Sequence, residues 1–427
     1  MHTQTDFEVE SLGRCQLRSP LEGGFVSTRT RVRYHVEIEE GNEPAEEILL
    51  EKAGPREHIF FDPTRSRAAV VTCGGLSPGL NNVIQAVFHS LHYNYRVRDV
   101  IGIRNGYMGM VADSGLSPVP LTHDYVEDID KLGGTVLGSS RGQQDVSAMA
   151  DFLQAEDINI LFCIGGDGTQ RGAHALCEEV KKRKAETAIV GIPKTIDNDI
   201  PFVWQSFGHA TALHRAAEVI KGAHVEARSA VNGIGLVKLM GRNAGFIAAG
   251  ATLASQEVNF TLIPEVAFPL EGPKGFLQAL EARMRARQHA VVVVAEGAGQ
   301  NLFDEGLLKP QYDASGNKLH QDIGILLKQK IGQYFADRGL PVTIKYLDPS
   351  YYIRSTPANT RDRILSDQMG RLAVDAAMAG KTDMLIGHLH NQFVHVPIVT
   401  TVRERRQLDV DGDTWQSVIR DTGQSRW

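Results

Sequence analysis

Two short runs, in each of which an apolar, β-branched segment leads into a turn that carries carboxylates, constrain this chain most. They read ILFCIGGDGT at 160–169 and IVGIPKTIDND at 189–199. Each has the composition of a buried strand followed by a glycine-rich or polar turn. Turns at the carboxyl ends of parallel strands meet over one edge of an open α/β sheet, where such sheets bind their ligands. The two runs therefore predict a phosphate-and-metal site on an α/β fold.

Length and composition favour an ordinary globular protein of two domains. The chain has 427 residues, of which 42% are hydrophobic and 22% charged, enough for two separate cores. The first residues mix acidic and polar side chains, so we expect no secretory signal. The longest apolar run, at 290–295, is far shorter than the roughly 20 residues that a membrane span needs. We expect a cytoplasmic location and no membrane partner.

The cysteines and the net charge exclude further classes. Cys15, Cys73, Cys163 and Cys177 show no paired metal-binding spacing, and reduced structural thiols fit a cytoplasmic protein. A net charge of −6 argues against a nucleic-acid partner, which would need a basic face. If the ligands are anionic, positive charge has to be concentrated locally.

Several zones can be distinguished along the chain. Residues 1–65 carry no βα repeat and are expected to form an accessory extension. From residue 66 to 206 the pattern strand, glycine-rich turn, helix recurs, and a second set of alternating strands and helices covers 207–353. The expected fold class is α/β, with two doubly wound, Rossmann-like domains.

The first glycine-rich turn, GGLSPGLN at 74–81, follows an apolar strand. Glycines let backbone N–H groups approach phosphate oxygens, and Pro78 precedes a helix whose N-terminus would point the same way. The turn matches neither GxGxxG nor a Walker A loop, so a purely structural tight turn remains the alternative.

The turn IGGDGT at 164–169 is a stronger signal. Its three glycines allow the loop to lie against a polyphosphate, Thr169 can donate to it, and Asp167 can hold Mg²⁺, directly or through water. In the alternative interpretation, Asp167 caps a helix that starts near Gln170.

The segment PKTIDND at 193–199 combines two carboxylates, a hydroxyl and a lysine. If the extended backbone persists beyond Pro193, Thr195, Asp197 and Asp199 point to one side, beside Lys194. Such a set suits deprotonation of a sugar hydroxyl during phosphoryl transfer. An Asx-turn followed by a helix cap is the alternative.

Cationic side chains at four separate places could form a phosphate clamp: Arg141, Arg242, Lys345 and Arg354. Each follows a strand-like run or adjoins Gly, Ser or Tyr, and none lies on an amphipathic helix. The run RERR at 403–406, by contrast, is expected to be a solvated face.

Eight motifs occur together in one order: GGLSPGLN, GYMGM, LGSSRG, IGGDGT, PKTIDND, KLMGRNAGFIA, AEGAGQN and DPSYYIR. In order and spacing the chain resembles the 6-phosphofructokinases, most of all the longer ATP-dependent group of plants, trypanosomatids and some bacteria. The resemblance covers about residues 66–400. It implies two domains of the phosphofructokinase type: a nucleotide-binding domain at 66–206 plus about 354–400, and a sugar-phosphate domain at 207–353. Residues 1–65 and a tail at 401–427 flank them.

The resemblance also implies roles for single residues on the donor side. Asp197 would be the catalytic base, with Arg141 facing the transferred phosphoryl group and Thr195 beside the sugar. Asp167 would bind Mg²⁺. The residues implied in ATP binding are Gly75, Tyr107, Arg141, Gly142, Gly166, Asp167, Gly168 and Thr169.

For the sugar, the resemblance implies a site for fructose 6-phosphate made of Thr195, Ile196, Asp197, Met240, Gly241, Arg242, Glu296, Lys345, Tyr351, Tyr352, Ile353 and Arg354. Two positions depart from shorter bacterial relatives, which have arginines where this chain has Lys345 and Gly233. A lysine keeps the charge but loses the bidentate fork. No function can be transferred to Gly233.

Gly168 and Lys194 bear on the phosphoryl donor. In the family the resemblance points to, pyrophosphate users carry Asp at the position of Gly168, and its carboxylate would oppose the α-phosphate of a nucleotide. Lys194 is shared with pyrophosphate users. We weight Gly168 more heavily and expect ATP as the donor.

The activity that the resemblance implies is ATP-dependent phosphorylation of fructose 6-phosphate to fructose 1,6-bisphosphate in glycolysis, by direct in-line transfer. A pyrophosphate-dependent transferase, a lipid or NAD kinase sharing GGDGT, and a non-catalytic sugar-phosphate sensor are the alternatives. The resemblance further implies an allosteric enzyme that forms a homodimer or homotetramer.

Overall fold

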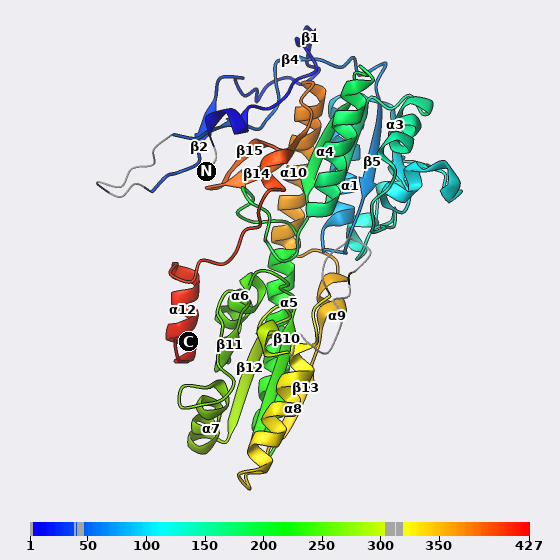
Figure 1. Ribbon diagram of the computed structural model, residues 1–427. Coiled ribbons are helices and arrows are strands. Elements are labelled where there is room, and N and C mark those ends of the chain that lie inside the picture. Colours follow the sequence, from blue (N-terminus) through cyan, green and yellow to red (C-terminus); the bar gives the residue numbers. More distant parts are fainter. Residues whose placement is uncertain (1–2, 38–39, 41–46, 304–311, 313–318) are drawn as a thin grey trace. The chain divides into compact units, whose positions relative to one another are not determined.

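The computed structural model describes residues 3–37, 40, 47–303, 312 and 319–427 (Figure 1). The chain forms two compact units. Unit 1 comprises Met1–Ile196, Ile200–Gly208 and Ser355–Arg405, and unit 2 comprises Asp197–Asp199, His209–Arg354 and Arg406–Trp427. Residues 1–65 thus group with unit 1, and the tail from Arg406 groups with unit 2. The parts of 1–65 at 1–2, 38–39 and 41–46 lie outside the described residues.

Unit 1 is built on a large mixed sheet. Among the described residues nine strands form it, in the order β2 (Arg31–Arg33), β3 (Leu49–Lys52), β15 (Gln392–Pro397), β14 (Met384–Leu389), β9 (Ala188–Pro193), β8 (Ile160–Gly165), β5 (Arg67–Thr72), β6 (Asp99–Ile103) and β7 (Val119–Pro120). The central pairs from β14 to β6 are parallel, and the outer pairs are antiparallel. The parallel, doubly wound centre agrees with the expected fold class.

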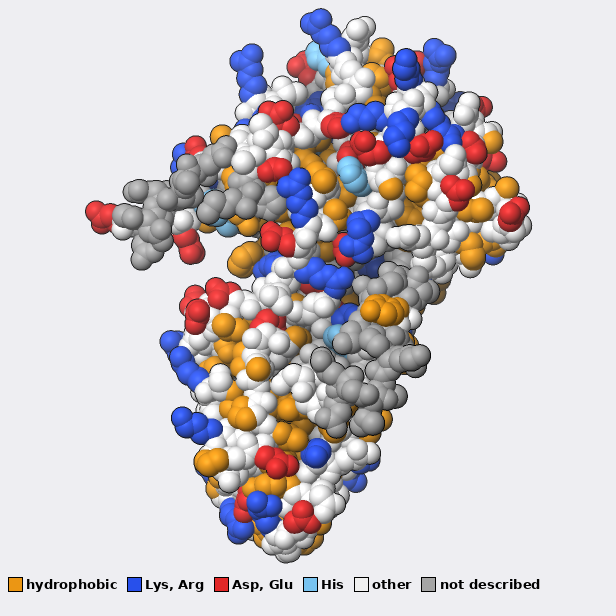
Figure 2. Space-filling model, in the orientation of Figure 1, with side chains coloured by type: hydrophobic (Ala, Val, Ile, Leu, Met, Phe, Trp, Pro, Cys, Tyr) orange, Lys and Arg blue, Asp and Glu red, His pale blue; other side chains and the backbone are white. Residues whose placement is uncertain are grey.

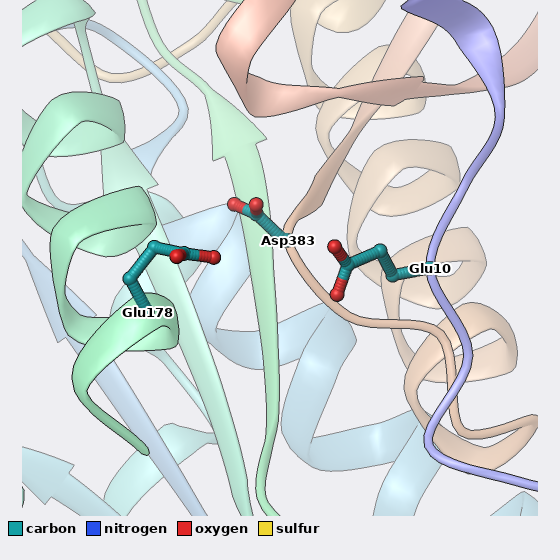
Figure 3. Close-up of side chains that lie close together, drawn as sticks. All are labelled: Glu10, Glu178 and Asp383. Carbon is teal, nitrogen blue, oxygen red and sulfur yellow. The ribbon is translucent and has the colours of Figure 1, made fainter. Parts of the chain in front are cut away.

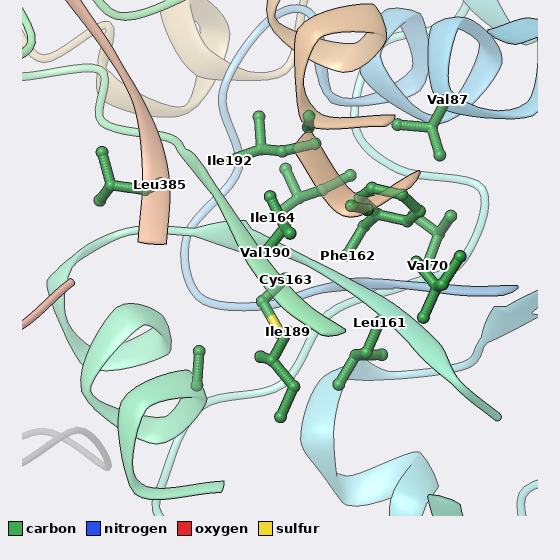
Figure 4. Packing of buried hydrophobic residues seen from close by; sticks show 14 of the residues in the cluster. Val70, Val87, Leu161, Phe162, Cys163, Ile164, Ile189, Val190, Ile192 and Leu385 are labelled. Carbon is green, nitrogen blue, oxygen red and sulfur yellow. The ribbon is translucent and has the colours of Figure 1, made fainter. Parts of the chain in front are cut away.

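The helices of unit 1 are α1 (Leu80–His89), α2 (His123–Val126), α3 (Val146–Ala155), α4 (Asp167–Lys182), α10 (Thr360–Met378) and α11 (Ile398–Thr401). Helix α1 packs on α10, and α3 and α11 pack on α4. Strands β8 and β9 are buried at every position, as expected for parallel strands covered on both faces. In Figure 4, Phe162 and Ile192 lie on the side of Val87 in α1, whereas Leu161 and Ile189 project the other way.

Unit 2 has a smaller sheet, formed among the described residues by four strands in the order β11 (Phe260–Leu262), β12 (His289–Ala295), β10 (Gly233–Leu239) and β13 (Thr343–Leu347), all parallel. Its helices are α5 (His209–Ser229), α6 (Phe246–Ser255), α7 (Phe276–Arg287), α8 (Ile323–Ala336), α9 (Ser350–Arg354) and α12 (Asp413–Thr422). Along β10, Ile234 and Leu236 join a core with α7 and α8. A Cβ on Gly235 would lie only 3.1 Å from that of Ala223 in α5. Both faces of this sheet are therefore covered.

The N-terminal residues extend the sheet of unit 1. Strand β3 pairs antiparallel with β15, and β2 pairs with β3. A second, two-stranded pairing joins β1 (Leu17–Arg18) to β4 (His58–Ile59). The expected accessory extension is therefore packed into unit 1 where it is described.

The surface carries both signs of charge. On the face drawn in Figure 2, Lys and Arg side chains are interspersed with Asp and Glu side chains. No helix in the described part of the chain combines the length and the apolar composition needed to cross a membrane.

Candidate active site

Three turns that follow adjacent parallel strands form the donor side of the candidate site in unit 1. Thr72 of β5 pairs with Ile164 of β8, and Gly165 of β8 pairs with Pro193 of β9. The three strands therefore end at the same level. The turns GGLSPGLN, IGGDGT and PKTIDND follow directly, as the sequence predicts.

The GGLSPGLN turn needs glycine for steric reasons. Gly79, the residue before α1, has a φ of 103°, and a Cβ there would lie 2.5 Å from the Ser366 hydroxyl. The turn also brings charge close to its backbone: a Cβ on Gly75 would lie 3.3 Å from Nη2 of Arg141. The buried Lys194 donates from Nζ to the carbonyl oxygen of Gly75 at 2.6 Å. Arg141 and Lys194 thus both lie next to Gly75.

The LGSSRG loop is tied to the same turn by hydrogen bonds. The amide of Gly74 donates to the carbonyl of Ser140 at 3.0 Å, and the Ser139 hydroxyl donates to the carbonyl of Gly74 at 2.6 Å. Gly142 has a φ of 99°, which favours glycine. The loop therefore presents the exposed Arg141 at a fixed place beside the first glycine turn.

The IGGDGT turn becomes helix α4 without a capping side chain. Gly166 is the N-cap and Asp167 is the first helical residue, so the helix begins three residues before Gln170. The alternative in which Asp167 caps the helix is therefore wrong. A Cβ on Gly165 would lie 2.1 Å from the Thr169 hydroxyl oxygen, whereas a Cβ on Gly168 would meet no atom within 4 Å. Packing explains the first of these glycines but not Gly168.

The carboxylate of Asp167 lies at the N-terminus of α4 and is paired with two guanidinium groups. Nη1 of Arg171 lies 2.9 and 2.8 Å from its oxygens, and Nη2 of Arg405 lies 3.3 Å from Oδ2. The Asp167 side chain is 24% exposed. An exposed carboxylate oxygen is the ligand type that Mg²⁺ prefers, so this residue fits a magnesium ion that keeps most of its waters.

Tyr107 contacts the IGGDGT turn where it becomes helix α4. Its buried hydroxyl donates to the carbonyl of Thr169 at 2.8 Å, and a Cβ on Gly172 would lie 2.7 Å from its ring. Burial keeps the pKa of this phenol well above its ordinary value, so the group stays a neutral donor. The contact holds the first turn of α4 in place.

The PKTIDND segment does not continue as an extended strand. β9 ends at Pro193, the amide of Thr195 donates to the Ser206 hydroxyl at 2.9 Å, and Asn198 has a φ of 61°. A left-handed residue breaks the alternation of side chains, so the expected alignment of Thr195, Asp197 and Asp199 on one side of a strand is wrong. Lys194, Thr195 and Ile196 belong to unit 1, and Asp197 is the first residue of the chain in unit 2.

In unit 2 the KLMGR motif covers the end of β10 and the turn that follows it, and this turn contacts Asp197. The amide of Arg242 donates to Oδ2 of Asp197 at 3.4 Å. Gly241 has a φ of 129°, and a Cβ on Gly297 would lie 2.0 Å from the carbonyl oxygen of Arg242. Two strand-end turns therefore pack backbone against backbone, and the neighbouring Met240 is buried.

Glu296 follows β12 beside this turn. Its amide donates to the carbonyl of Leu239 at 2.9 Å. Burial raises the pKa of its carboxyl above the ordinary value, and the positive charges of Arg242 and Lys238 oppose that shift. A partly buried acid among cations is suited to accept hydrogen bonds from sugar hydroxyls.

The short helix α9 presents most of the YYIR run. Ile353 is fully buried and anchors the helix, while Tyr351 and Tyr352 are 75% and 56% exposed. The guanidinium of Arg354 lies over the Tyr351 ring at 4.6 Å, and that of Arg215 over the Tyr352 ring at 5.9 Å.

The two departures from shorter relatives both lie on the α5 side of the small sheet. A Cβ on Gly233 would lie 2.0 Å from the carbonyl oxygen of Ala227, so the backbone of α5 leaves no room for a side chain there. Lys345, on the edge strand β13, pairs with Glu226 of α5 at 3.4 Å and remains partly exposed.

The RERR run at 403–406 is exposed at Arg403, Glu404 and Arg405, as expected of a solvated face, but it also makes contacts that the sequence did not predict. Arg405 pairs with Asp167, and the amide of Arg406 donates to the carbonyl of Asp199 at 2.9 Å. The signal that could have identified these residues is the one used for Arg141, because the run follows apolar residues and lies outside any amphipathic helix.

One further group of acidic side chains lies away from these turns (Figure 3). Ligand oxygens of Glu10, Glu178 and Asp383 lie within 4.8 Å of one another. Cationic and imidazole groups of the chain already contact them: Lys181 Nζ is 2.6 Å from Glu10 and 3.5 Å from Glu178, and His174 Nδ1 is 2.8 Å from Asp383. The group connects the N-terminal segment to α4, and we assign no metal to it.

Comparison with known proteins gives the family directly. The phosphofructokinase family model matches residues 67–377. The chain is 47% identical to an ATP-dependent 6-phosphofructokinase of Borreliella burgdorferi, over 98% of this chain and 97% of that protein. It is 45% identical to a protein of the same name from Amycolatopsis methanolica, over 98% and 95%, and 40% identical to one from Trypanosoma brucei brucei, over 97% and 87%.

Solved structures share the fold at lower identity. A pyrophosphate-dependent phosphofructokinase from Marinobacter aquaeolei superposes with a TM-score of 0.68 at 21% identity, covering 84% of this chain and 91% of that one. Phosphofructokinase from Pichia pastoris gives a TM-score of 0.64 at 23% identity, covering 80% of this chain and 36% of that one. The solved structures agree in fold, and the family model and the close relatives show that the chain belongs to the phosphofructokinase family.

Proposed function

We propose that the protein is an ATP-dependent 6-phosphofructokinase, which converts fructose 6-phosphate to fructose 1,6-bisphosphate in glycolysis. Relatives that match nearly the whole chain carry the name ATP-dependent 6-phosphofructokinase. The observation that carries the choice of donor is the open space at Gly168, at the start of α4. Packing of the described residues does not require glycine there, and the open space leaves room for a large donor.

On the donor side, the chain supplies backbone amides and two cations, Arg141 and Lys194. The amides at the N-terminus of α4 and the glycine turn at Gly75 can bind phosphate oxygens, with the positive end of the helix dipole adding to the attraction. Arg141 lies beside Gly75 and can stabilise charge on the transferred phosphoryl group. When Mg²⁺ is bound at Asp167, it neutralises charge on the donor's phosphate oxygens.

On the acceptor side, we assign the base to Asp197. Its carboxylate, held by the Arg242 amide, would take the proton from the 1-hydroxyl of the sugar while that oxygen attacks the γ-phosphorus in line. The bond from this phosphorus to the β–γ bridging oxygen would break, and ADP would leave. Arg242, Glu296 and Arg354 would bind the hexose phosphate. The role of Lys345 toward a sugar phosphate, including one bound by a neighbouring subunit, stays a prediction.

The base assignment can be tested by substitution. In the variant Asp197→Ser, kcat should fall about a thousandfold, since general base catalysis is lost, while the affinity for fructose 6-phosphate changes much less. Turnover that survives in this variant would show that another group accepts the proton.

The donor is tested by steady-state kinetics with fructose 6-phosphate and Mg²⁺, comparing ATP with pyrophosphate. We expect turnover with ATP. Turnover with pyrophosphate but not with ATP would assign the protein to the pyrophosphate-dependent enzymes. One such enzyme shares the fold of this chain. Binding of fructose 6-phosphate without turnover of either donor would identify a sugar-phosphate sensor instead. A homodimer or homotetramer, allosteric regulation and a cytoplasmic location stay predictions.

A further inference from the structure

Lys238, the first residue of the KLMGR motif, is a lysine of unit 2 to which no role has been assigned so far. Lys238 is the second-last residue of β10, and its side chain is only 11% exposed. Its ammonium lies 2.6 Å from Oδ2 of Asp322 and 2.9 Å from Oδ2 of Asp348. A nearly buried ammonium is costly unless it is paired, and here two carboxylates pair with it.

The two carboxylates also hold the starts of two helices. Asp322 is the N-cap of α8 and accepts from the amide of Ile325 at 3.1 Å and from the hydroxyl of Tyr346 at 3.1 Å. Asp348 accepts from both the amide and the hydroxyl of Ser350, at 3.2 and 2.6 Å. Ser350 is the first residue of α9. One ammonium thus connects β10 to the beginnings of α8 and α9.

Helix α9 depends on such anchors. It has five residues, Ser350–Arg354, and a helix this short is unstable without tertiary contacts. Its buried anchor is Ile353, and its first turn is held through Asp348. The side chains that it presents, Tyr351 and Arg354, belong to the sugar-phosphate site proposed above.

The same ammonium acts on a second part of that site. Lys238 pairs in register with Val294 of β12, two residues before Glu296. Its positive charge is among those that oppose the rise in the pKa of the partly buried Glu296 carboxyl. Removing the charge would leave Glu296 more readily protonated and would remove the ion pair of Asp348 with Lys238.

We propose that Lys238 is a positioning residue for the sugar-phosphate site: through Asp348 it fixes α9, and with it Arg354, in the orientation that receives the hexose phosphate. Lys238 itself need not touch the substrate. The inference rests on the proposed function, because it concerns the affinity of that site.

The first test is the variant Lys238→Met, which keeps the length of the side chain and removes its charge. We expect KM for fructose 6-phosphate to rise about tenfold, while KM for ATP and kcat change less than about twofold. A matched control is Lys330→Met, an exposed lysine of α8, which should leave all three constants unchanged. Unchanged KM for fructose 6-phosphate in Lys238→Met, or an equal loss of ATP affinity, would overturn the proposal.

A second variant keeps the test decisive if Lys238→Met does not fold. Asp348→Asn leaves the pair between Lys238 and Asp322 intact and should raise KM for fructose 6-phosphate by a similar factor. In the double variant the two effects should not add, since both break one contact. Additive effects would mean that Lys238 does not act through Asp348.

Failure of the proposed function can be told apart from failure of this inference. Calorimetric titration of fructose 6-phosphate onto the wild-type protein and Lys238→Met measures the site without turnover. Weaker binding in the variant supports the positioning role even if neither ATP nor pyrophosphate is a donor, and equal binding excludes it.

Discussion

At the scale of single residues, Gly168 carries our proposal for the phosphoryl donor. It is the second residue of α4, its backbone is helical, and the space that a Cβ would enter is empty. Other glycines of the same loops are required by packing, for example Gly165, whose Cβ would collide with Thr169. At Gly168 a Cβ would meet no atom within 4 Å, and in our proposal this space receives the nucleotide.

The first prediction concerns Gly168→Asp. An aspartate in the first turn of a helix is favourable, so the fold should be retained and the melting temperature unchanged or slightly raised. Its charge would oppose the phosphates of ATP, and we expect kcat/KM for ATP to fall about a hundredfold or more. Kinetics with ATP and with pyrophosphate, beside a melting curve, measure both effects.

The matched control for this change is Gly222→Asp. Gly222 lies on an exposed face of α5 and a Cβ there would also meet no atom within 4 Å. This variant should keep the kinetic constants of the wild type. Equal ATP kinetics in Gly168→Asp and the wild type would remove the donor argument.

At the scale of elements, local pattern predicts the strands and where they end. The apolar runs before IGGDGT and PKTIDND form β8 and β9, which end at the same level because they pair in register. The sequence pattern does not predict the turn that PKTIDND makes just after β9. Asn198 there has a left-handed backbone conformation, which depends on contacts of the folded turn and not on the periodicity of a strand. The pattern also misses a contact of the exposed RERR run at 403–406, because Arg405 pairs with Asp167, which is distant in sequence.

The turns after β10 and β12 give the second prediction. A Cβ on Gly297 would lie 2.0 Å from the carbonyl oxygen of Arg242. The Cβ is bonded directly to the backbone of one turn and the oxygen belongs to the backbone of the other, so the clash can be relieved only if a turn moves. In Gly297→Ala we expect a loss of about 2 kcal/mol in the free energy of unfolding and a raised KM for fructose 6-phosphate. Denaturant unfolding and steady-state kinetics test the two parts.

For comparison, Gly222→Ala adds the same methyl group to a helix with open space. It should leave the kinetics unchanged and stabilise by up to about 1 kcal/mol, because alanine favours the helix. If Gly297→Ala is as stable and active as this control, the close approach of the two turns does not constrain the site.

At the scale of the whole molecule, the sequence pattern predicted no secondary structure for the N-terminal residues 1–65. They show no βα repeat, yet β2 and β3 continue the sheet of unit 1 through β15. The contact is stabilised by a buried group of charges. Glu51 of β3 accepts from Nη2 of Arg56 at 2.8 Å and from Nζ of Lys381 at 2.9 Å, and is itself only 7% exposed. Such long-range pairing cannot be read from an isolated segment.

The ionisation of Glu51 makes this contact dependent on pH. Burial alone would raise the pKa of its carboxyl, but His395, Lys381 and the hydrogen bonds they make hold the pKa well below its ordinary value. Burial lowers the pKa of His395, while Arg56 and Lys381 pair with Glu51 at 2.8 and 2.9 Å. A carboxyl with a lowered pKa stabilises the fold above its ordinary pKa, and this contribution is lost as the pH falls.

We therefore predict that Glu51→Gln lowers the free energy of unfolding by about 3 kcal/mol at neutral pH, because two buried cations lose their partner. The difference from the wild type should shrink below about pH 4, where the unfolded wild-type chain takes up the proton. Glu47→Gln, which breaks only an exposed pair with Arg33, should change stability by less than about 1 kcal/mol at any pH. Melting curves from pH 3 to pH 8 measure all three proteins, and a difference between Glu51→Gln and the wild type that stays constant over this range would show that the carboxylate does not hold the N-terminal strands in place.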